Sequence, residues 1–358
     1  MQIGIVGLPN VGKSSLFNAL TSGHAASSNY PFTTIDPNVG VVAVPDTRLK
    51  RLTQVFVSQS TIAPAINFVD IAGLVKGASQ GEGLGNKFLS HIREVDAIIH
   101  LVRLFEDADV VHTLGSVDPK RDVEVIETEL ILSDIQAIDK QIEKNQSAVK
   151  AGNKEAKERV QVMEKIMERL SQGKPALTLG FAKEELAPYF LLTAKPVLFV
   201  GNTPEGGSDE GMHQGLRALT KERGSVYLDI SVKLESEIAQ IADAAERQTF
   251  LQSMGLERSG LDRVILAAQE ALGLITFFTA GPKETRGWNV VKGAKAPQAA
   301  GKIHTDMEKG FIRADTYTFA DIDRLGTEIA LRDAGLIRSE GKEYVVKDGD
   351  VMFFKFSK

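Results

Sequence analysis

One string, from Gly7 to Ser14, constrains this chain more than any other feature. It reads G-L-P-N-V-G-K-S and fits the pattern G-x-x-x-x-G-K-[ST]. The apolar run Gln2 to Val6 precedes it, and a helical spacing of apolar residues that includes Leu16 and Leu20 follows it. In a strand, turn and helix of this order, backbone N–H groups and the positive end of the helix point at phosphate oxygens. The string therefore predicts a triphosphate-binding loop.

The residue types within this loop predict separate roles. Lys13 is expected to reach the β- and γ-phosphate oxygens and to stabilise charge during hydrolysis, and Ser14 Oγ is expected to bind Mg²⁺. The nucleotide-binding residues predicted in this segment are Asn10, Val11, Gly12, Lys13, Ser14 and Ser15.

Other parts of a nucleotide site follow in chain order. Asp70 ends the apolar run Ala65 to Val69, where a carboxylate can hold a water bound to Mg²⁺, and Gly73 follows where the γ-phosphate would be sensed. Thr34 lies in Y-P-F-T-T, which offers hydroxyls to the same metal. Four glycines in the nine residues from Gly77 to Gly85 predict a mobile switch loop without regular structure.

Composition limits the remaining classes of protein. A length of 358 residues predicts two or three domains. A formal charge of −5 argues against a polycation that coats nucleic acid or anionic membrane, and the lack of cysteine excludes disulfides, thiolate-bound zinc, Fe–S clusters and thiol catalysis. No basic leader and no apolar run of about 18 residues is present, so we expect a soluble, cytoplasmic protein without a membrane partner.

The pattern along the chain predicts an α/β protein. Further β-branched runs at Ala97 to Val102, Pro196 to Val200 and Val226 to Ile230 are typical of a mostly parallel sheet. Between the first and second of these, apolar residues with helical spacing flank the turn Ala151-Gly152-Asn153 and predict an inserted antiparallel helical hairpin. This hairpin is either an ordinary packing element or a projecting coiled coil that contacts a partner.

The last part of the chain has short strand-like runs, Leu274 to Thr279, Thr316 to Thr318 and Val351 to Phe356, which predict a small α+β domain. Between Gly281 and Arg313, seven basic residues face three acidic ones, and Trp288 lies among them. This stretch is either an RNA contact, through stacking and phosphate pairing, or a solvated surface. The domain boundaries predicted from these patterns are 1–121, 122–190, 191–271 and 272–358.

Recognition of the base is expected after the later strands. Asn202-Thr203-Pro204-Glu205 and Ser231-Val232-Lys233 stand where a GTPase has N-K-x-D and S-A-K. Because Thr203 and Glu205 replace the lysine and aspartate, the usual reading of guanine should be weak, whereas Asn202 can offer its amide to adenine. Asn202, Thr203 and Ser231 complete the predicted nucleotide-binding residues.

The strings around these motifs resemble the Obg-related, YchF-type P-loop ATPases, called Obg-like ATPases in eukaryotes. They are the loop itself, Y-P-F-T-T-I-D-P-N-V-G from Tyr30 to Gly40, and D-I-A-G-L-V-K-G-A-S-Q-G-E-G-L-G-N from Asp70 to Asn86. The resemblance spans the whole chain. It implies an Obg-type G domain interrupted by a helical coiled-coil domain and followed by a C-terminal TGS domain.

The resemblance also implies roles for single residues. The Mg²⁺ ligands fall on Ser14 and Thr34, and the base site falls on Asn202 and on the backbone of Thr203. Leu74 stands where many GTPases have a water-orienting glutamine, and the resemblance assigns that task to His112. Asn10 is similar to the asparagine that coordinates K⁺ in related NTPases.

The sequence therefore predicts a cytoplasmic, Mg²⁺-dependent ATPase that prefers ATP, with RNA and not DNA as the candidate partner of its basic stretch. The resemblance adds K⁺ as a candidate second cation and the large ribosomal subunit as the expected partner. A GTPase of ordinary base preference is one alternative. A ribosome- or RNA-binding module, in which hydrolysis only times release, is another.

Overall fold

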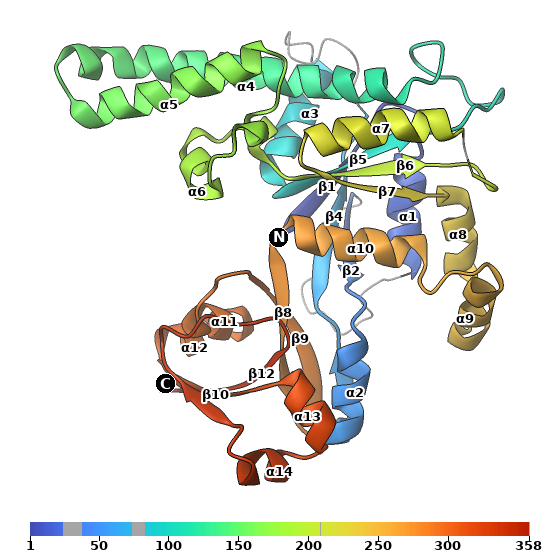
Figure 1. Ribbon diagram of the computed structural model, residues 1–358, viewed down its shortest axis with the longest axis vertical. Coiled ribbons are helices and arrows are strands. Elements are labelled where there is room, and N and C mark those ends of the chain that lie inside the picture. Colours follow the sequence, from blue (N-terminus) through green and yellow to red (C-terminus); the bar gives the residue numbers. More distant parts are fainter. Residues whose placement is uncertain (24–37, 74–82, 208, 358) are drawn as a thin grey trace. The chain divides into compact units, whose positions relative to one another are not determined.

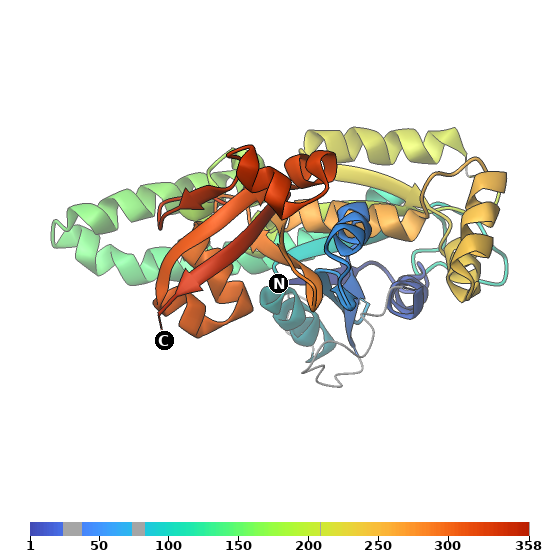
Figure 2. The same cartoon turned by 90° about the horizontal axis from the view of Figure 1, so that it is seen from below.

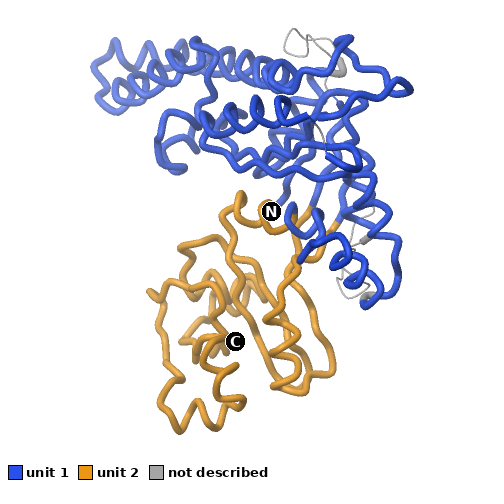
Figure 3. The backbone as a smooth tube through the Cα atoms, turned by 45° about the vertical axis from the view of Figure 1, so that its right-hand side comes forward, with its two compact units in different colours: residues 1–23, 36–40, 68–264 blue, residues 24–35, 41–67, 265–358 orange. Residues whose placement is uncertain are grey.

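The computed structural model describes residues 1–23, 38–73, 83–207 and 209–357, which group into two compact units (Figure 3). The described part of the first unit is 1–23, 38–40, 68–73, 83–207 and 209–264, and that of the second is 41–67 and 265–357. These units group residues that lie close together in space. They do not test the predicted domain boundaries 1–121, 122–190, 191–271 and 272–358, which stay a prediction.

The first sheet has six strands in the order β2-β4-β1-β5-β6-β7, and its strands β2 and β4 extend into the chain segment that is assigned to the second unit. The bounds are Val39–Ala43 for β2, Ala65–Asp70 for β4, Gln2–Val6 for β1, Ala97–Arg103 for β5, Val197–Asn202 for β6 and Val226–Ile230 for β7. β1 pairs with β5, β5 with β6 and β6 with β7, each in parallel. All seven residues of β5 are buried, as expected of a central strand covered on both faces. The mostly parallel sheet is as predicted.

Helices of the first unit follow the strands. They are α1 (Lys13–Gly23), α3 (Gly83–Glu94), α7 (Glu210–Glu222), α8 (Val232–Gln240), α9 (Ala244–Ser253) and α10 (Gly260–Ala271), which continues into the second unit (Figure 1). The glycine-rich segment Gly77 to Gly85 was expected to lack regular structure; its residues 77–82 lie outside the described part of the chain, and Gly83 to Gly85 open α3.

The predicted hairpin between β5 and β6 consists of α4 (Pro119–Lys150) and α5 (Lys154–Ser171), which lie side by side (Figures 1 and 2). Asp118 caps α4 and Asn153 caps α5, each with its side-chain oxygen. Isoleucines of α4 meet Met163 and Ile166 of α5 in a buried cluster. Short elements lead back to β6: η2 (Ala176–Leu179), α6 (Lys183–Leu186), η3 (Ala187–Tyr189) and η4 (Leu192–Ala194).

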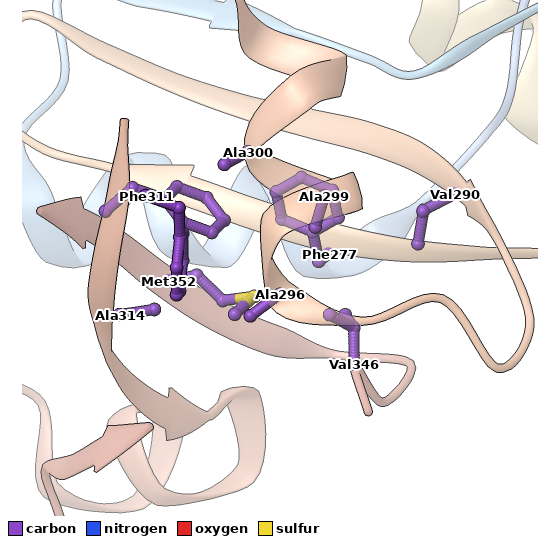
Figure 4. Packing of buried hydrophobic residues seen from close by; sticks show 10 residues of the cluster. Phe277, Val290, Ala296, Ala299, Ala300, Phe311, Ala314, Val346 and Met352 are labelled. Carbon is purple, nitrogen blue, oxygen red and sulfur yellow. The ribbon is translucent and has the colours of Figure 1, made fainter. Parts of the chain in front are cut away.

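The second unit is a mixed sheet of order β11-β10-β12-β8-β9-β3. The bounds are Arg338–Glu340 for β11, Phe311–Thr318 for β10, Asp350–Phe356 for β12, Leu274–Ala280 for β8, Glu284–Val291 for β9 and Ser60–Ile62 for β3. Its helices are α2 (Thr47–Phe56), α11 (Ala296–Ile303), α12 (Thr305–Lys309), α13 (Phe319–Leu325) and α14 (Glu328–Asp333). Figure 4 shows Phe277 and Met352 of the sheet packed with Ala299 and Ala300 of α11.

A short early segment belongs to this second sheet. Ser60 to Ile62 pairs in parallel with Glu284 to Arg286 of β9, so residues more than two hundred positions apart share a ladder. Leu49 and Leu52 of α2 pack in the same unit against Phe278. The three strand-like runs predicted in the last part of the chain lie in β8, β10 and β12.

Candidate functional site

The loop between β1 and α1 has backbone positions that only glycine suits. Gly12 has a φ of 100°, and a Cβ there would lie 2.7 Å from Asn202 Nδ2. A Cβ on Gly7 would lie 2.5 Å from the carbonyl oxygen of Leu101. These close approaches let the loop fold tightly over the ends of β5 and β6, so that α1 begins at Lys13.

Lys13 places a mostly buried cation at the start of α1. Its side chain donates from Nζ to the Leu8 carbonyl at 2.9 Å. Burial lowers the pKa of Lys13, and the charge of Asp70 opposes this shift. A Cβ on Gly73 would lie 3.0 Å from Lys13 Nζ, so the structure brings these two predicted residues together. A desolvated ammonium beside a helix N-terminus is suited to bind a polyanion.

Ser14 and Asp70 form a pair of hard oxygen donors. Ser14 Oγ donates to Asp70 Oδ2 at 2.9 Å, which links α1 to the end of β4. A hydroxyl and one carboxylate fit Mg²⁺, which binds through few protein oxygens and keeps water and phosphate in its shell. The described residues hold no cluster of three or more His, Asp or Glu side chains that could bind a metal ion. Thr34, the other predicted ligand, lies outside the described residues, as does Leu74.

Asn202, the last residue of β6, links the loop to α8. Its Nδ2 donates to the Val11 carbonyl at 2.9 Å, and its Oδ1 accepts from the N–H of Val232 at 3.1 Å. The side chain is thus buried and hydrogen-bonded at both ends of its amide. We expected this amide to be offered to adenine, but here the protein backbone uses it.

The other residues predicted for the base are engaged in similar local contacts. The N–H of Thr203 donates to the Ile230 carbonyl at 2.8 Å, and Ser231 caps α8 by accepting from Leu234. Glu205, which replaces the guanine-reading aspartate, forms an ion pair with Lys233 at 3.0 Å. The hydrogen bond that Lys233 donates to Glu205, and then the charge of Glu205, raise the pKa of Lys233, and the ion pair occupies the carboxylate of Glu205.

A cavity of about 840 Å³ lies where these elements meet. Five predicted nucleotide-binding residues line it: Asn10, Gly12, Ser15, Asn202 and Thr203. Val11, Lys13, Ser14, Gly73, Asp70 and Ser231 are not among its lining residues. The cavity therefore opens from the loop toward the two base motifs, where a nucleoside would extend.

Sequence reasoning missed one wall of this cavity. Phe105, Glu106, Asp107 and Val110 follow directly after β5 and line the cavity together with Pro204, Glu205, Val232, Lys233, Ser236 and Glu237. A usable signal existed, because ligands of open parallel sheets bind beyond the carboxyl ends of the strands and β5 was predicted. His100 was also missed: burial, and then the charge of Lys13, lowers its pKa to about 3, so it is neutral beside the loop.

The structure does not place His112 in the cavity wall. Its Nε2 lies 2.8 Å from Asp122 Oδ2, and its Nδ1 accepts from the N–H of Leu114 at 3.2 Å. Asn10 lies near this segment, because its Nδ2 donates to the Val111 carbonyl at 3.1 Å. Asn10 therefore connects the phosphate-binding loop to the residue next to His112.

In the second unit, Trp288 is less open than the RNA interpretation required. The guanidinium of Arg286 lies 4.1 Å from its ring centroid, and Phe277 stacks with the indole at 6.5 Å between centroids. Trp288 Nε1 donates to Thr279. Contacts of this stretch with RNA would therefore rely on its exposed lysines.

Comparison with known proteins agrees with this arrangement. A family model described as a 50S ribosome-binding GTPase matches residues 2–165, and the model called YchF-GTPase_C, a protein of unknown function, matches residues 274–357. The chain is 47% identical to the ribosome-binding ATPase YchF of Bacillus subtilis (strain 168), over 100% of this chain and 99% of that protein. This chain belongs to the YchF family.

The YchF family assignment extends to eukaryotic relatives and to a solved structure. The chain is 44% identical to Obg-like ATPase 1 of Gallus gallus, over 100% of this chain and 92% of that protein. The structure of the Schizosaccharomyces pombe YchF GTPase matches with a TM-score of 0.89 and 37% identity, over 99% of this chain and 97% of that chain. The resemblance drawn from the motifs is thus confirmed, and so is the fold class. In the described residues of this YchF chain, no helix is long and apolar enough to cross a bilayer.

Proposed function

We propose that this chain hydrolyses ATP to ADP and phosphate with Mg²⁺. The observation that supports this most is the loop Gly7 to Ser14, which holds buried Lys13 and the Ser14–Asp70 pair and whose Asn10 and Gly12 line a cavity shared with the base motif. Lys13 stabilises charge on the transferred phosphoryl group. Ser14 and Thr34 would hold Mg²⁺, and Asp70 would anchor its shell; the bound ion would supply positive charge at the phosphate oxygens.

The preference for ATP over GTP rests on the altered base motif. In a GTPase the motif's aspartate accepts from guanine N1–H and N2–H, but Glu205 is engaged by Lys233. Guanine would therefore have to compete with Lys233 for this carboxylate, whereas adenine has no N1–H and needs no such acceptor. A GTPase of ordinary preference remains the competing function.

The experiment is phosphate release from ATP and from GTP, each with Mg²⁺, first in K⁺ and then in Na⁺. We expect turnover of ATP, weaker turnover of GTP, and loss of both in Lys13→Ala. Lys302→Ala, a change at an exposed lysine, is the matched control. Equal or better turnover of GTP would favour the competing function, and a dependence on K⁺ would support a K⁺ site at Asn10.

His112 is our candidate for the residue that orients the attacking water. Both of its ring nitrogens are engaged, so this role requires the segment that includes Val111 and His112 to release the pair with Asp122. His112→Ala should lose turnover and retain ATP binding. Loss of binding together with turnover would point to a role in folding instead.

We further propose that the chain acts in the cytoplasm and associates with the large ribosomal subunit. Several relatives are named ribosome-binding ATPases, including that of Escherichia coli O157:H7 at 48% identity. The basic stretch Gly281 to Arg313 supplies exposed cations for RNA phosphates. Reversing Lys292, Lys295 and Lys302 to glutamate should reduce co-sedimentation with ribosomes, and unchanged binding would exclude this surface. If ribosome release, but not binding, depends on hydrolysis, the chain is a binding module timed by its nucleotide.

A further inference from the structure

Arg103 is a buried cation at the carboxyl end of the central strand β5. Its residue is 2% exposed, and its hydrogen bonds go to backbone carbonyls of the described chain and not to a carboxylate. Burial of a charge without an opposite charge is costly unless hydrogen bonds compensate for lost hydration. The contacts of its guanidinium therefore indicate what the residue does.

Three backbone carbonyls of one loop receive this guanidinium. Nε donates to the carbonyl of Phe105 at 2.9 Å, Nη1 to that of Val110 at 3.0 Å, and Nη2 to that of Asp107 at 3.5 Å. The same guanidinium carbon lies 4.4 Å from the centroid of the Phe105 ring. The planar fork of arginine can meet several acceptors at once, which a lysine ammonium on its flexible stem cannot reproduce.

The loop held in this way is the wall of the nucleotide cavity that sequence reasoning missed. Its residues Phe105, Asp107 and Val110 line the cavity together with the base motif residues Thr203 and Glu205. Arg103 is paired in register with Asn202, so two neighbouring residues at one sheet edge each fix a different loop. Asn202 fixes the phosphate-binding loop, and Arg103 fixes residues 105–110.

We propose that Arg103 is a positioning residue that holds the 105–110 wall in place for the nucleoside part of the ligand. It acts through the carbonyls of the wall and does not touch the phosphates. This inference rests on the proposed function, because it needs a nucleotide in the cavity. Its particular consequence is that the loss of Arg103 weakens binding of the nucleoside and spares binding of the triphosphate.

The test compares two ligands by calorimetry in Mg²⁺: ATP, and inorganic tripolyphosphate, which lacks the nucleoside. Arg103→Lys should weaken ATP binding about tenfold or more, because several hydrogen bonds to a charged group are lost, and should leave tripolyphosphate within about twofold. Arg169→Lys is the matched control, since Arg169 also donates to a backbone carbonyl, that of Thr178, in the inserted helical region. Equal weakening of both ligands, or no weakening of either, would overturn the proposal.

Phe105→Leu provides a second variant that keeps Arg103 and the backbone acceptors. It should also weaken ATP and spare tripolyphosphate, and unchanged ATP binding would show that this wall does not meet the nucleoside. Hydrogen exchange in Arg103→Lys should rise in residues 104–112 and stay constant in 97–102. Faster exchange in both segments, or failure of the variant to fold, would mean that Arg103 supports the core instead.

The wild-type chain separates this proposal from the proposed function. Binding of neither ligand would contradict nucleotide binding itself. Equal affinity for ATP and tripolyphosphate would leave the phosphate site intact and contradict only the role of the wall.

Discussion

His112 Nε2 lies 2.8 Å from Asp122 Oδ2, and the two side chains are 5% and 4% exposed. Because Nδ1 accepts from the N–H of Leu114, Nε2 bears the proton and donates it to Asp122. In this arrangement neither ring nitrogen is free to accept a hydrogen bond from water. The pair must open before His112 can orient an attacking water molecule.

Opening this pair should therefore raise basal hydrolysis. We expect Asp122→Leu to increase phosphate release from ATP severalfold and to reduce the free energy of unfolding by about 1–3 kcal/mol, since His112 loses its buried acceptor. Asp122→Asn keeps an acceptor oxygen and should change both quantities less. Phosphate release and urea denaturation measure the two effects. Slower hydrolysis in a folded Asp122→Leu chain would contradict this role of His112.

The buried charge of Lys13 should favour ATP binding and lower the free energy of unfolding of the nucleotide-free protein. Burial lowers the pKa of Lys13 from its ordinary value of 10.5. Between the lowered pKa and 10.5, Lys13 therefore binds more protons in the unfolded chain than in the folded one. In that pH window its contribution to the free energy of unfolding rises with pH. At neutral pH Lys13 is protonated in both states, so the whole desolvation cost of its ammonium lowers the free energy of unfolding. Lys13→Met should then raise the free energy of unfolding by about 0.5–2 kcal/mol and abolish ATP binding.

Urea denaturation of the nucleotide-free protein, from pH 7 upward, measures this effect. The gain from Lys13→Met should shrink as the pH approaches the reference value of 10.5. Lys302→Met, at an exposed lysine, should show no such trend. A Lys13→Met chain less stable than the wild type at pH 7 would contradict the prediction.

Loss of the Asn202 amide should weaken the binding of ATP and of GTP to a similar extent. Asn202→Ala removes both bonds of the amide, to Val11 and to Val232, and leaves buried backbone groups unpaired. We expect a loss of about 1–3 kcal/mol in the free energy of unfolding and weaker binding of ATP and GTP by similar factors. Thermal denaturation and nucleotide titration measure these effects. Asn145→Ala, which removes a bond within α4, is the control. Selective loss of ATP alone would show that the amide reads the base.

Val57 should be replaceable with a gain in stability. It follows α2 with φ 49° and ψ 45°, a left-handed conformation that a β-branched residue adopts only with strain, and it is 81% exposed. Val57→Gly should raise the free energy of unfolding by about 0.5–1 kcal/mol, because relief of strain exceeds the added chain entropy. Val291→Gly, at the exposed end of β9, should lower it. A destabilised Val57→Gly chain in thermal denaturation would contradict the conformational argument.

Much of the fold was predictable because its signals are local. The strand Gln2–Val6, the loop after it and the start of α1 at Lys13 follow from residue types and spacing within twenty positions. The helical hairpin follows likewise from periodicity and from the turn at Gly152. Pairing of Ser60–Ile62 with β9 was not predictable, since a three-residue strand gives too little pattern to identify a distant partner.

The sequence by itself determined which residues form the phosphate-binding loop, and its long motifs determined the family. Only the tertiary structure decided how the side chains near the loop are used. The amide of Asn202 is taken up by Val11 and Val232, and Arg103 holds a wall that no motif marks. The physical reason is that a motif records backbone conformation and residue type, whereas hydrogen-bond partners depend on which strand ends the folded sheet brings together.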